Sequence, residues 1–184
     1  MPDEPPTAPQ GGPERDVLDR LLVQVPALAG SIAGGFRRIP LGSSFRRRVV
    51  NLQVKRAFSA MARSDVEVLL LSYEPDAEVW MRTMSGVGIS DCYRGHEGIR
   101  TLYSDLDEAF ADWAWSARAV ADGGDRIAVR CDFVGYGRSS GVQTAVKDGG
   151  TAIKLSARGL VGWQAWFAEQ EGWTKALEAV GLRE

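Results

Sequence analysis

Arg130 and Asp132 are the charged residues of this sequence whose types and spacing best suit acid–base chemistry. They belong to the segment 126–136, whose residues alternate as in a β-strand, so both side chains point to one face. On a face that lines a pocket, Asp132 would serve as a general base, and Arg130 would lower its pKa and orient a substrate oxygen. The alternative is a solvated ion pair on the outer face or at a dimer interface, with Cys131 and Phe133 on the pocket side.

His96 is the one histidine of the chain, and it follows Gly95 at the start of the longest predicted helix. The dipole at a helix N-terminus disfavours the imidazolium form, so a neutral imidazole is expected there. A neutral histidine beside a pocket can transfer protons, which makes His96 a third candidate for catalysis. The alternative is a surface or capping histidine. The neighbouring Glu97 is interpreted as an acid of the first helical turn, where the same dipole favours a negative charge.

Aromatic side chains are the candidates for binding an apolar, planar ligand. Near the end of the chain, Trp163 and Phe167 alternate with Gln164 and Trp166, so the two sets point to opposite faces of a strand. One set would line the pocket, and the other would meet solvent, the N-terminal segment or a second subunit. The same residue types also serve as ordinary core. The full set is Trp80, Tyr93, Trp163, Trp166 and Phe167.

Neither a metal nor a phosphate-binding cofactor is expected. The two cysteines, Cys92 and Cys131, are too few for a disulfide scaffold, and with a single histidine they do not make a zinc site. Gly135, Gly137 and Gly141 follow a strand, but no helix opens after them, so the phosphate-loop patterns fail. Both cysteines are interpreted as packing residues.

Composition places the chain among globular proteins, with 184 residues, of which 45% are apolar and 25% charged. Residues 14–63 hold ten Lys/Arg against three Asp/Glu, which raises the question of nucleic acid or anionic lipid. The sequence contains no RNA-binding aromatic motif, no zinc-finger spacing and no basic heptads, so nucleic acid is not expected. The favoured interpretation of the basic segment is a solvated helix face.

The N-terminal region carries no secretory signal, because its first sixteen residues are rich in proline and acids. The longest uncharged stretch, 21–36, is interrupted by Pro26 and three glycines, which disfavours a membrane-spanning helix. The sequence therefore predicts a cytoplasmic protein with reduced thiols. A helix lying on a membrane surface is the alternative for residues 14–45, since arginines flank their apolar part.

The chain divides into a disordered tail at 1–13, an extension at 14–45 that packs on the domain or a partner, and a domain at 46–184. Helices are expected at 46–61, 66–71, 96–113 and 173–180. Strands are expected at 78–82, 115–121, 126–136, 151–156 and 160–167, with a glycine-rich loop at 85–95.

Hairpin-length links between the later strands predict an antiparallel sheet with helices on one side, which is an α+β fold. A strongly bent sheet folded over a long helix encloses a cone, and the mouth of the cone is a pocket. Such a sheet leaves its other face uncovered, so a homodimer through that face is also expected.

The pattern resembles the SnoaL-like branch of the nuclear transport factor 2-like superfamily over roughly residues 49–182. The segments that carry the resemblance are AFSAMARSDVEVLLLSYEPDAEVWM (57–81), YRGHEGIRTLYSDLDEAF (93–110), DRIAVRCDFVGYGRSSG (125–141) and LVGWQAWFAEQEGWTKALEAVGL (160–182). The resemblance implies the cone-shaped fold. It also implies that Trp163 and Phe167 point into the cone, where they join Trp80 and Tyr93 as ligand-binding candidates.

Relatives in this superfamily include ketosteroid isomerase, polyketide cyclases, scytalone dehydratase and limonene-epoxide hydrolase. The three polar side chains of ketosteroid isomerase fall here on Met81, on Ala57 and near Thr151, so its mechanism is not carried over. Limonene-epoxide hydrolase resembles the chain at Arg130-Cys131-Asp132, but its second Asp is replaced by Ala165. The resemblance implies that the chain binds a small hydrophobic molecule, either with acid–base turnover or as a non-catalytic binding or assembly domain.

Overall fold

The computed structural model describes residues 15, 17–25, 34–35, 38–82, 84 and 88–183, so the tail expected at 1–13 lies outside the described residues. The helices are α1 (Val17–Gln24), α3 (Ser44–Ala62), α4 (Val66–Leu70), α5 (Gly95–Ala109) and α6 (Gly172–Ala179). The strands are β1 (Tyr73–Met81), β2 (Cys92–Arg94), β3 (Phe110–Asp122), β4 (Arg126–Gly137), β5 (Gln143–Leu155) and β6 (Val161–Phe167).

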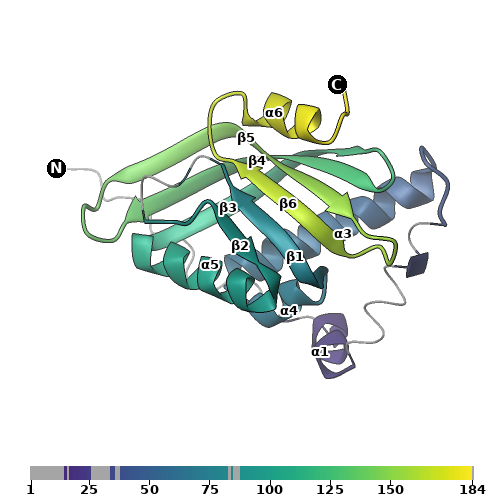
Figure 1. Cartoon of the computed structure of the whole chain (residues 1–184), viewed down its shortest axis with the longest axis horizontal. Helices are drawn as coiled ribbons and strands as arrows, with labels where there is room; N and C mark the ends of the chain where they lie inside the picture. Colours follow the sequence, from purple (N-terminus) through teal and green to yellow (C-terminus); the bar gives the residue numbers. More distant parts are fainter. Residues whose placement is uncertain are drawn as a thin grey trace.

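The strands form one curled sheet in the order β2-β1-β6-β5-β4-β3, and α3 runs behind it in Figure 1. Neighbouring strands are antiparallel except β1 and β6, which are parallel. The predicted α+β class is confirmed. The sheet differs from the expected all-antiparallel meander in two ways, because β2 forms within the expected loop 85–95 and β1 pairs in parallel with the distant β6.

The boundary between α5 and β3 also differs from the expectation. The apolar rhythm predicts a helix that continues to Trp113, but α5 ends at Ala109, and Phe110 is already extended. Trp113 pairs with Gly135 in the ladder between β3 and β4. The hydrogen bonds that β3 makes to β4 therefore outweigh the helical spacing of the apolar residues, and the chain is extended from Phe110 onward.

Two apolar clusters lie on opposite faces of the sheet. On the inner face, Cys131 and Phe133 of β4 belong to a large core shared with α3, α4 and α5. On the outer face, Ala128 of β4 and Ala152 of β5 pack against α6. The close approach of α6 needs Gly150, because a Cβ there would lie 2.5 Å from the carbonyl oxygen of Gly172.

Arg46 fixes α3 against the turn between β3 and β4. Its guanidinium is 2% exposed, and it donates from Nε and Nη2 to the two carboxylate oxygens of Asp122 at 2.6 and 3.0 Å. It also donates to the carbonyl oxygens of Ile39 and Gly124 at 3.1 and 2.8 Å. Ser43 caps the same helix end by accepting from the Arg46 amide. These contacts hold α3 in place at one end of the inner face.

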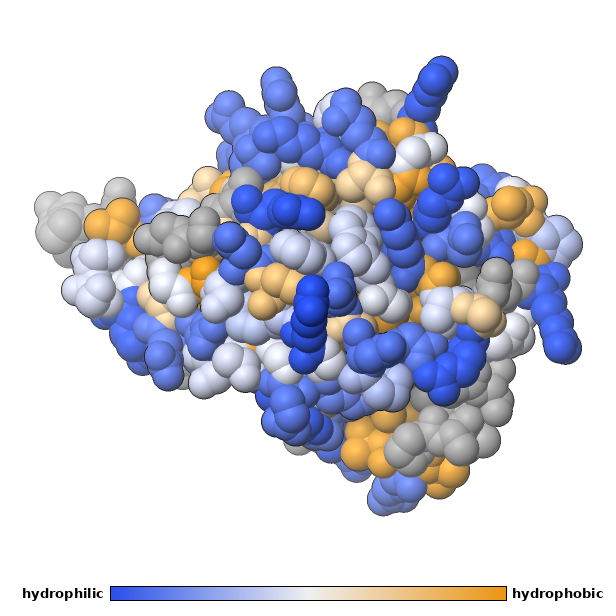
Figure 2. Space-filling view, in the orientation of Figure 1, coloured by the Kyte–Doolittle hydropathy of each residue, from blue (hydrophilic) through white to orange (hydrophobic). Residues whose placement is uncertain are grey.

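The surface in Figure 2 is mostly hydrophilic, with apolar atoms gathered over α1 at the lower edge. Val17, Leu21 and Val25 are exposed there, whereas Leu22 is buried. Only part of the apolar surface of α1 therefore packs on the domain. In the described ranges, no helix has the length and apolar character needed to cross a membrane.

Candidate functional site

Aromatic side chains fill the part of the inner core around Trp115 and Trp166. Trp115 contacts Trp166 and Phe133 with ring centroids 4.4 and 4.7 Å apart, and Phe133 contacts Phe110 at 5.4 Å. The space left beside them is about 20 Å³, bordered by side chains that include Tyr73, Tyr103 and Trp166. A volume of this order holds about one water molecule, so this part of the core has no room for a ligand.

A larger cavity of about 170 Å³ lies between α3, α4 and the inner face of the sheet. The helix α3 contributes Val54, Ala57 and Ala60, while β5 contributes Ile153 and Leu155. Ala57 and Ala60 have the smallest side chains that a helix can present apart from glycine, and they leave the volume between helix and sheet unfilled. The cavity is therefore a consequence of small residues on the apolar stripe of α3.

Two surface segments close the sides of this cavity. Leu22 of α1 forms one wall, and Gly159 and Leu160 of the loop before β6 form another. The loop is fixed by Glu74, a buried acid that accepts hydrogen bonds from Ser156 and Arg158. The extension at 14–45 therefore contributes a wall of the cavity through α1.

A chain of hydrogen-bonded polar side chains lies on the inner face of the sheet. Tyr73 donates its hydroxyl to the amide oxygen of Gln164, and the Gln164 amide nitrogen donates to the Thr151 hydroxyl at 2.9 Å. Gln164 pairs with Ile153 in the sheet, and Ile153 lines the large cavity. Burial raises the pKa of Tyr73 well above its ordinary value, and it does the same for Tyr103. These hydroxyls therefore stay neutral hydrogen-bonding groups.

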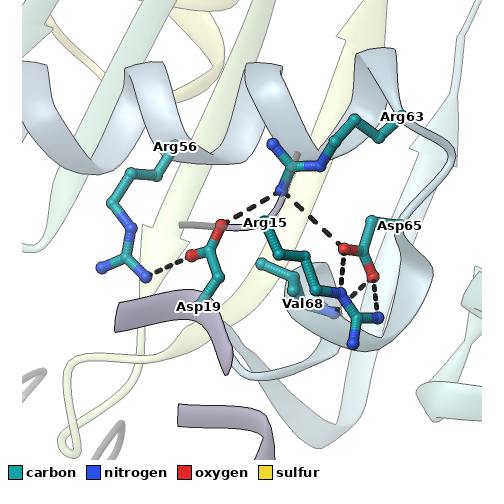
Figure 3. A network of polar contacts seen from close by, with 6 residues as sticks. All are labelled: Arg15, Asp19, Arg56, Arg63, Asp65 and Val68. Carbon is teal, nitrogen blue, oxygen red and sulfur yellow. Dashed lines mark hydrogen bonds and ion pairs between the residues drawn. The ribbon is translucent and has the colours of Figure 1, made fainter. Parts of the chain in front are cut away.

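A network of ion pairs joins α1 to α3 and α4 beside the cavity (Figure 3). Asp19 of α1 is buried and accepts from Arg56 Nη2 at 2.5 Å and from Arg63 Nη2 at 3.1 Å. Arg15 donates from Nε and Nη2 to the two oxygens of Asp65 at 2.5 and 2.6 Å. Arg56 also lines the cavity, so the network brings one cation to an otherwise apolar wall.

Arg130 and Asp132 lie on the outer face of β4, which corrects the expectation that they face the pocket. They are also not paired with each other. Arg130 donates to Asp148, and Asp132 accepts from Arg118, whose side chain is 62% exposed. Cys131 and Phe133 occupy the inner face instead. The strand therefore has the orientation of the stated alternative, but each of the two residues pairs with another partner.

Trp163, Phe167 and Trp80 are also on the outer face, against the expectation that they line the pocket. Trp163 and Phe167 pack on the cluster around α6, and Lys154 covers the Trp163 ring at 4.6 Å. The inner face carries Gln164 and Trp166 in their place, because α6 gives the outer face a core of its own. Trp80 donates its ring N–H to Glu78 at 3.2 Å and lies under the Arg82 guanidinium.

His96 and Tyr93 lie outside both cavities. The Nε2 atom of His96 is 3.3 Å from the Tyr73 carbonyl oxygen, so the ring contacts the backbone of β1. The Tyr93 hydroxyl donates to Asp105 at 2.5 Å and accepts from the Ser90 amide at 2.8 Å. Burial and the Asp105 carboxylate raise the pKa of Tyr93 to about 12. Trp166 borders the small cavity, but none of the other seven candidates lines either cavity: Arg130, Asp132, His96, Trp80, Tyr93, Trp163 and Phe167.

The residues that border the large cavity were missed because they give little chemical signal in the sequence. Ala57 and Val54 belong to a recognisable apolar stripe, but a stripe does not reveal the space it leaves. Gln164 lines neither cavity, but it does give a signal, since a lone amide between apolar neighbours on a buried strand predicts a buried hydrogen-bonding partner. In the described part of the chain, no group of three His, Cys, Asp or Glu side chains could hold a metal ion.

A family model for the SnoaL-like domain matches residues 54–169. The chain belongs to the SnoaL-like domain family. The match covers α3 from Val54, all strands of the sheet and the lining of both cavities except Leu22, Val50 and Gln53. A comparison with curated protein sequences gave no match.

Solved structures with the same fold support this SnoaL-like assignment. TerC co-crystallised with polyporic acid is 17% identical with a TM-score of 0.56, and the match covers 68% of this chain and 95% of TerC. An NTF2-like protein of unknown function from Burkholderia pseudomallei is 17% identical with a TM-score of 0.58, covering 71% and 96%. A protein from Catenulispora acidiphila with a ketosteroid isomerase-like fold, in complex with trimethylamine, is 14% identical with a TM-score of 0.52, covering 71% and 92%. At these identities the likeness concerns the fold.

Proposed function

We propose that this SnoaL-like protein binds a small apolar molecule in the cavity between α3, α4 and the inner face of the sheet. The observation that carries the proposal is the volume of about 170 Å³ with mainly apolar walls. A cavity of roughly 150 Å³ with such walls is enough to bind benzene in another protein. Two structural relatives, TerC with polyporic acid and the Catenulispora protein with trimethylamine, hold small molecules.

Binding without turnover is favoured over acid–base catalysis. Among the described residues that line the cavity, Arg56 is the one ionisable side chain. General acid–base chemistry needs a group whose pKa lies near the working pH and within reach of the reacting atom, and arginine does not supply one. Cyclase-type or isomerase-type turnover therefore has no catalytic pair at this cavity in the described structure.

The test uses ethylbenzene, a neutral probe that fits a cavity of this size. Its binding to the full chain is measured by NMR, and a dissociation constant on the order of 0.1–1 mM is expected for so few non-hydrogen atoms. Val54→Trp places a large ring in the cavity and is expected to abolish binding. Leu52→Trp is the matched control, because Leu52 is exposed on the same helix. Equal binding by the two variants, or no binding by the wild type, would overturn the proposal.

The homodimer expected through the outer face of the sheet stays a prediction. Part of that face is covered by α6, and the rest carries the charged side chains of Arg118, Arg130, Asp132 and Asp148. Light scattering at micromolar concentration would contradict the dimer if it gave only the 20.0 kDa mass of one chain.

A further inference from the structure

Asp19 accepts a hydrogen bond from the Nη2 atom of Arg56 but none from its Nε atom. Its Nη2 donates to Oδ1 of Asp19 at 2.5 Å, while the second oxygen of Asp19 accepts from Arg63. The Nε atom of Arg56 is buried and has no hydrogen-bond acceptor in the part of the chain that the structure describes. A buried N–H without an acceptor carries a desolvation cost that an added acceptor would remove.

Two other arginines of the same protein show what a complete pairing looks like. Arg46 and Arg15 each direct Nε and Nη2 at the two oxygens of a single carboxylate, Asp122 and Asp65 respectively. This two-bond geometry is the preferred recognition of a carboxylate by a guanidinium. Arg56 has the same pair of donors, and one of the two is unused.

We propose that the cavity takes a small apolar molecule bearing a carboxylate, and that Arg56 binds this carboxylate through Nε. This inference rests on the proposed function, since Arg56 lines the same cavity. The apolar part of the ligand lies against Val54, Ala57 and Ile153, and its carboxylate lies at the charged edge beside α1. Asp19 then competes with the ligand carboxylate for Arg56, and it accepts from Nη2 when no ligand is bound.

The surroundings favour a single carboxylate over a phosphate. Arg56 is the one cation among the described lining residues, and the other walls are mainly apolar. A phosphate would bring up to two negative charges and more oxygens than one guanidinium satisfies, and burying the surplus charge is costly. A monocarboxylate matches the single charge of Arg56 and supplies the acceptor that its buried Nε lacks.

The test compares para-ethylbenzoate with para-ethylbenzamide, which have nearly the same shape and differ in charge. Affinities for the full chain are measured by NMR titration at neutral pH. The benzoate is expected to bind about tenfold more tightly than the amide, because hydrogen bonds to charged groups contribute more than neutral ones. Arg56→Gln is expected to remove this preference while the amide still binds. Arg118→Gln removes the same charge from the outer face and is expected to keep the preference.

Asp19→Asn gives a second readout that a purely structural role would not produce. It removes the competing negative charge and keeps the shape of the side chain, so the benzoate is expected to bind several-fold more tightly with the amide unchanged. If Asp19 served only to hold α1 on the domain, the variant would weaken both ligands equally, which would count against the proposal.

The outcomes separate this inference from the proposed function. Equal affinity for benzoate and amide in the wild type, or a preference that survives Arg56→Gln, would overturn the assignment of a carboxylate ligand and leave the apolar cavity site standing. Failure of the amide, the benzoate and ethylbenzene to bind would overturn both.

Discussion

The Gln164 amide nitrogen donates a hydrogen bond of 2.9 Å to the Thr151 hydroxyl, which is wholly buried between β5 and β6. The amide oxygen of the same Gln164 accepts from Tyr73, so one side chain satisfies the hydroxyls of two others. Tyr73 borders the small aromatic cavity, and Gln164 pairs in the sheet with Ile153, which lines the cavity assigned to ligand. These hydrogen bonds are therefore expected to determine both the stability of the protein and the shape of the cavity.

Replacing Gln164 by leucine tests that relationship. Gln164→Leu leaves two hydroxyls without their partner, and an unsatisfied buried group costs about 1–3 kcal/mol, so a loss of about 2–4 kcal/mol in unfolding free energy is expected. Urea denaturation followed by tryptophan fluorescence measures it. Gln143→Leu, at an exposed position of β5, is the control and is expected to change stability by about 0.5 kcal/mol at most. A loss below about 1 kcal/mol for Gln164→Leu would contradict the importance of these hydrogen bonds.

Replacing Asp122 is expected to lower the free energy of unfolding far more than replacing Asp125, which lies three residues later in the same turn. Asp122→Ala leaves the buried Arg46 guanidinium without its carboxylate, and breaking a buried pair in this way costs about 3–5 kcal/mol. Asp125 lies 3.7 Å from Arg126 with both side chains about half exposed, so Asp125→Ala is expected to cost about 0–1 kcal/mol. Chemical denaturation of the two variants side by side gives the comparison. Similar costs would show that Arg46 does not depend on Asp122.

Much of the fold could be predicted because local patterns agree with the final structure. The strands β4 and β6 and the helix α6 begin and end within two residues of the expected ranges. The parallel pair of β1 and β6 could not be predicted, because the two strands lie about ninety residues apart and no local turn specifies their direction. Trp113 was assigned to a helix because its apolar spacing fits both a helix and the strand that the β4 ladder selects.

The candidate site could not be predicted from alternation alone. Both faces of β4 and β6 carry apolar residues, since α6 provides the outer face with a second core. Arg130 and Asp132 therefore fit a pocket or a solvated face equally well. For Trp163 the alternation is equally ambiguous, and only the family resemblance implies the inner face. A cavity is a property of packed volume, which small residues such as Ala57 create only in the folded structure.

The two cysteines are expected to differ sharply in reactivity. Cys131 is buried beneath the sheet, and burial raises the pKa of its thiol far above the ordinary range, so little thiolate forms. Cys92 is partly exposed. Iodoacetamide at pH 8 is expected to label Cys92 in the folded protein and Cys131 only in urea, as read by peptide mass spectrometry. Labelling of Cys131 in the folded Cys92→Ser variant would contradict its burial.

Acid is expected to loosen α1 before it unfolds the domain. The hydrogen bond from Arg15 holds the pKa of Asp65 below its ordinary value, although burial opposes the shift. A depressed folded-state pKa means that the ionised carboxylate stabilises the docked state above pH of about 4, and that this contribution is lost as the pH falls through the lower folded value. Amide exchange of residues 17–24, corrected for intrinsic rates, should therefore accelerate between about pH 4 and pH 2.

Asp65→Asn provides the control for the acid effect. The variant keeps an N-cap acceptor for α4 and removes the charge that Arg15 binds, so its α1 amides should exchange faster at neutral pH. The same amides should respond less to acid than those of the wild type. An identical pH response in the two proteins would show that Asp65 is not the group that holds α1.

Asp132→Asn is expected to leave both stability and ligand binding nearly unchanged. The Asp132 side chain lies on the outer face, and its partner Arg118 is 62% exposed, so solvent screens the pair. Burial alone would raise the pKa of Asp132, but hydrogen bonds from Arg118 and the Asp148 amide lower it, so the carboxylate stays ionised well below neutral pH. A solvated pair of this kind contributes about 0–1 kcal/mol, and Asp132→Asn is expected to stay within that range in urea denaturation. Ethylbenzene affinity should equal that of the wild type, because Asp132 lies on the opposite side of the sheet from Ile153 and the cavity. A loss of about 3 kcal/mol or more, or a weaker probe affinity, would return Asp132 to the binding site.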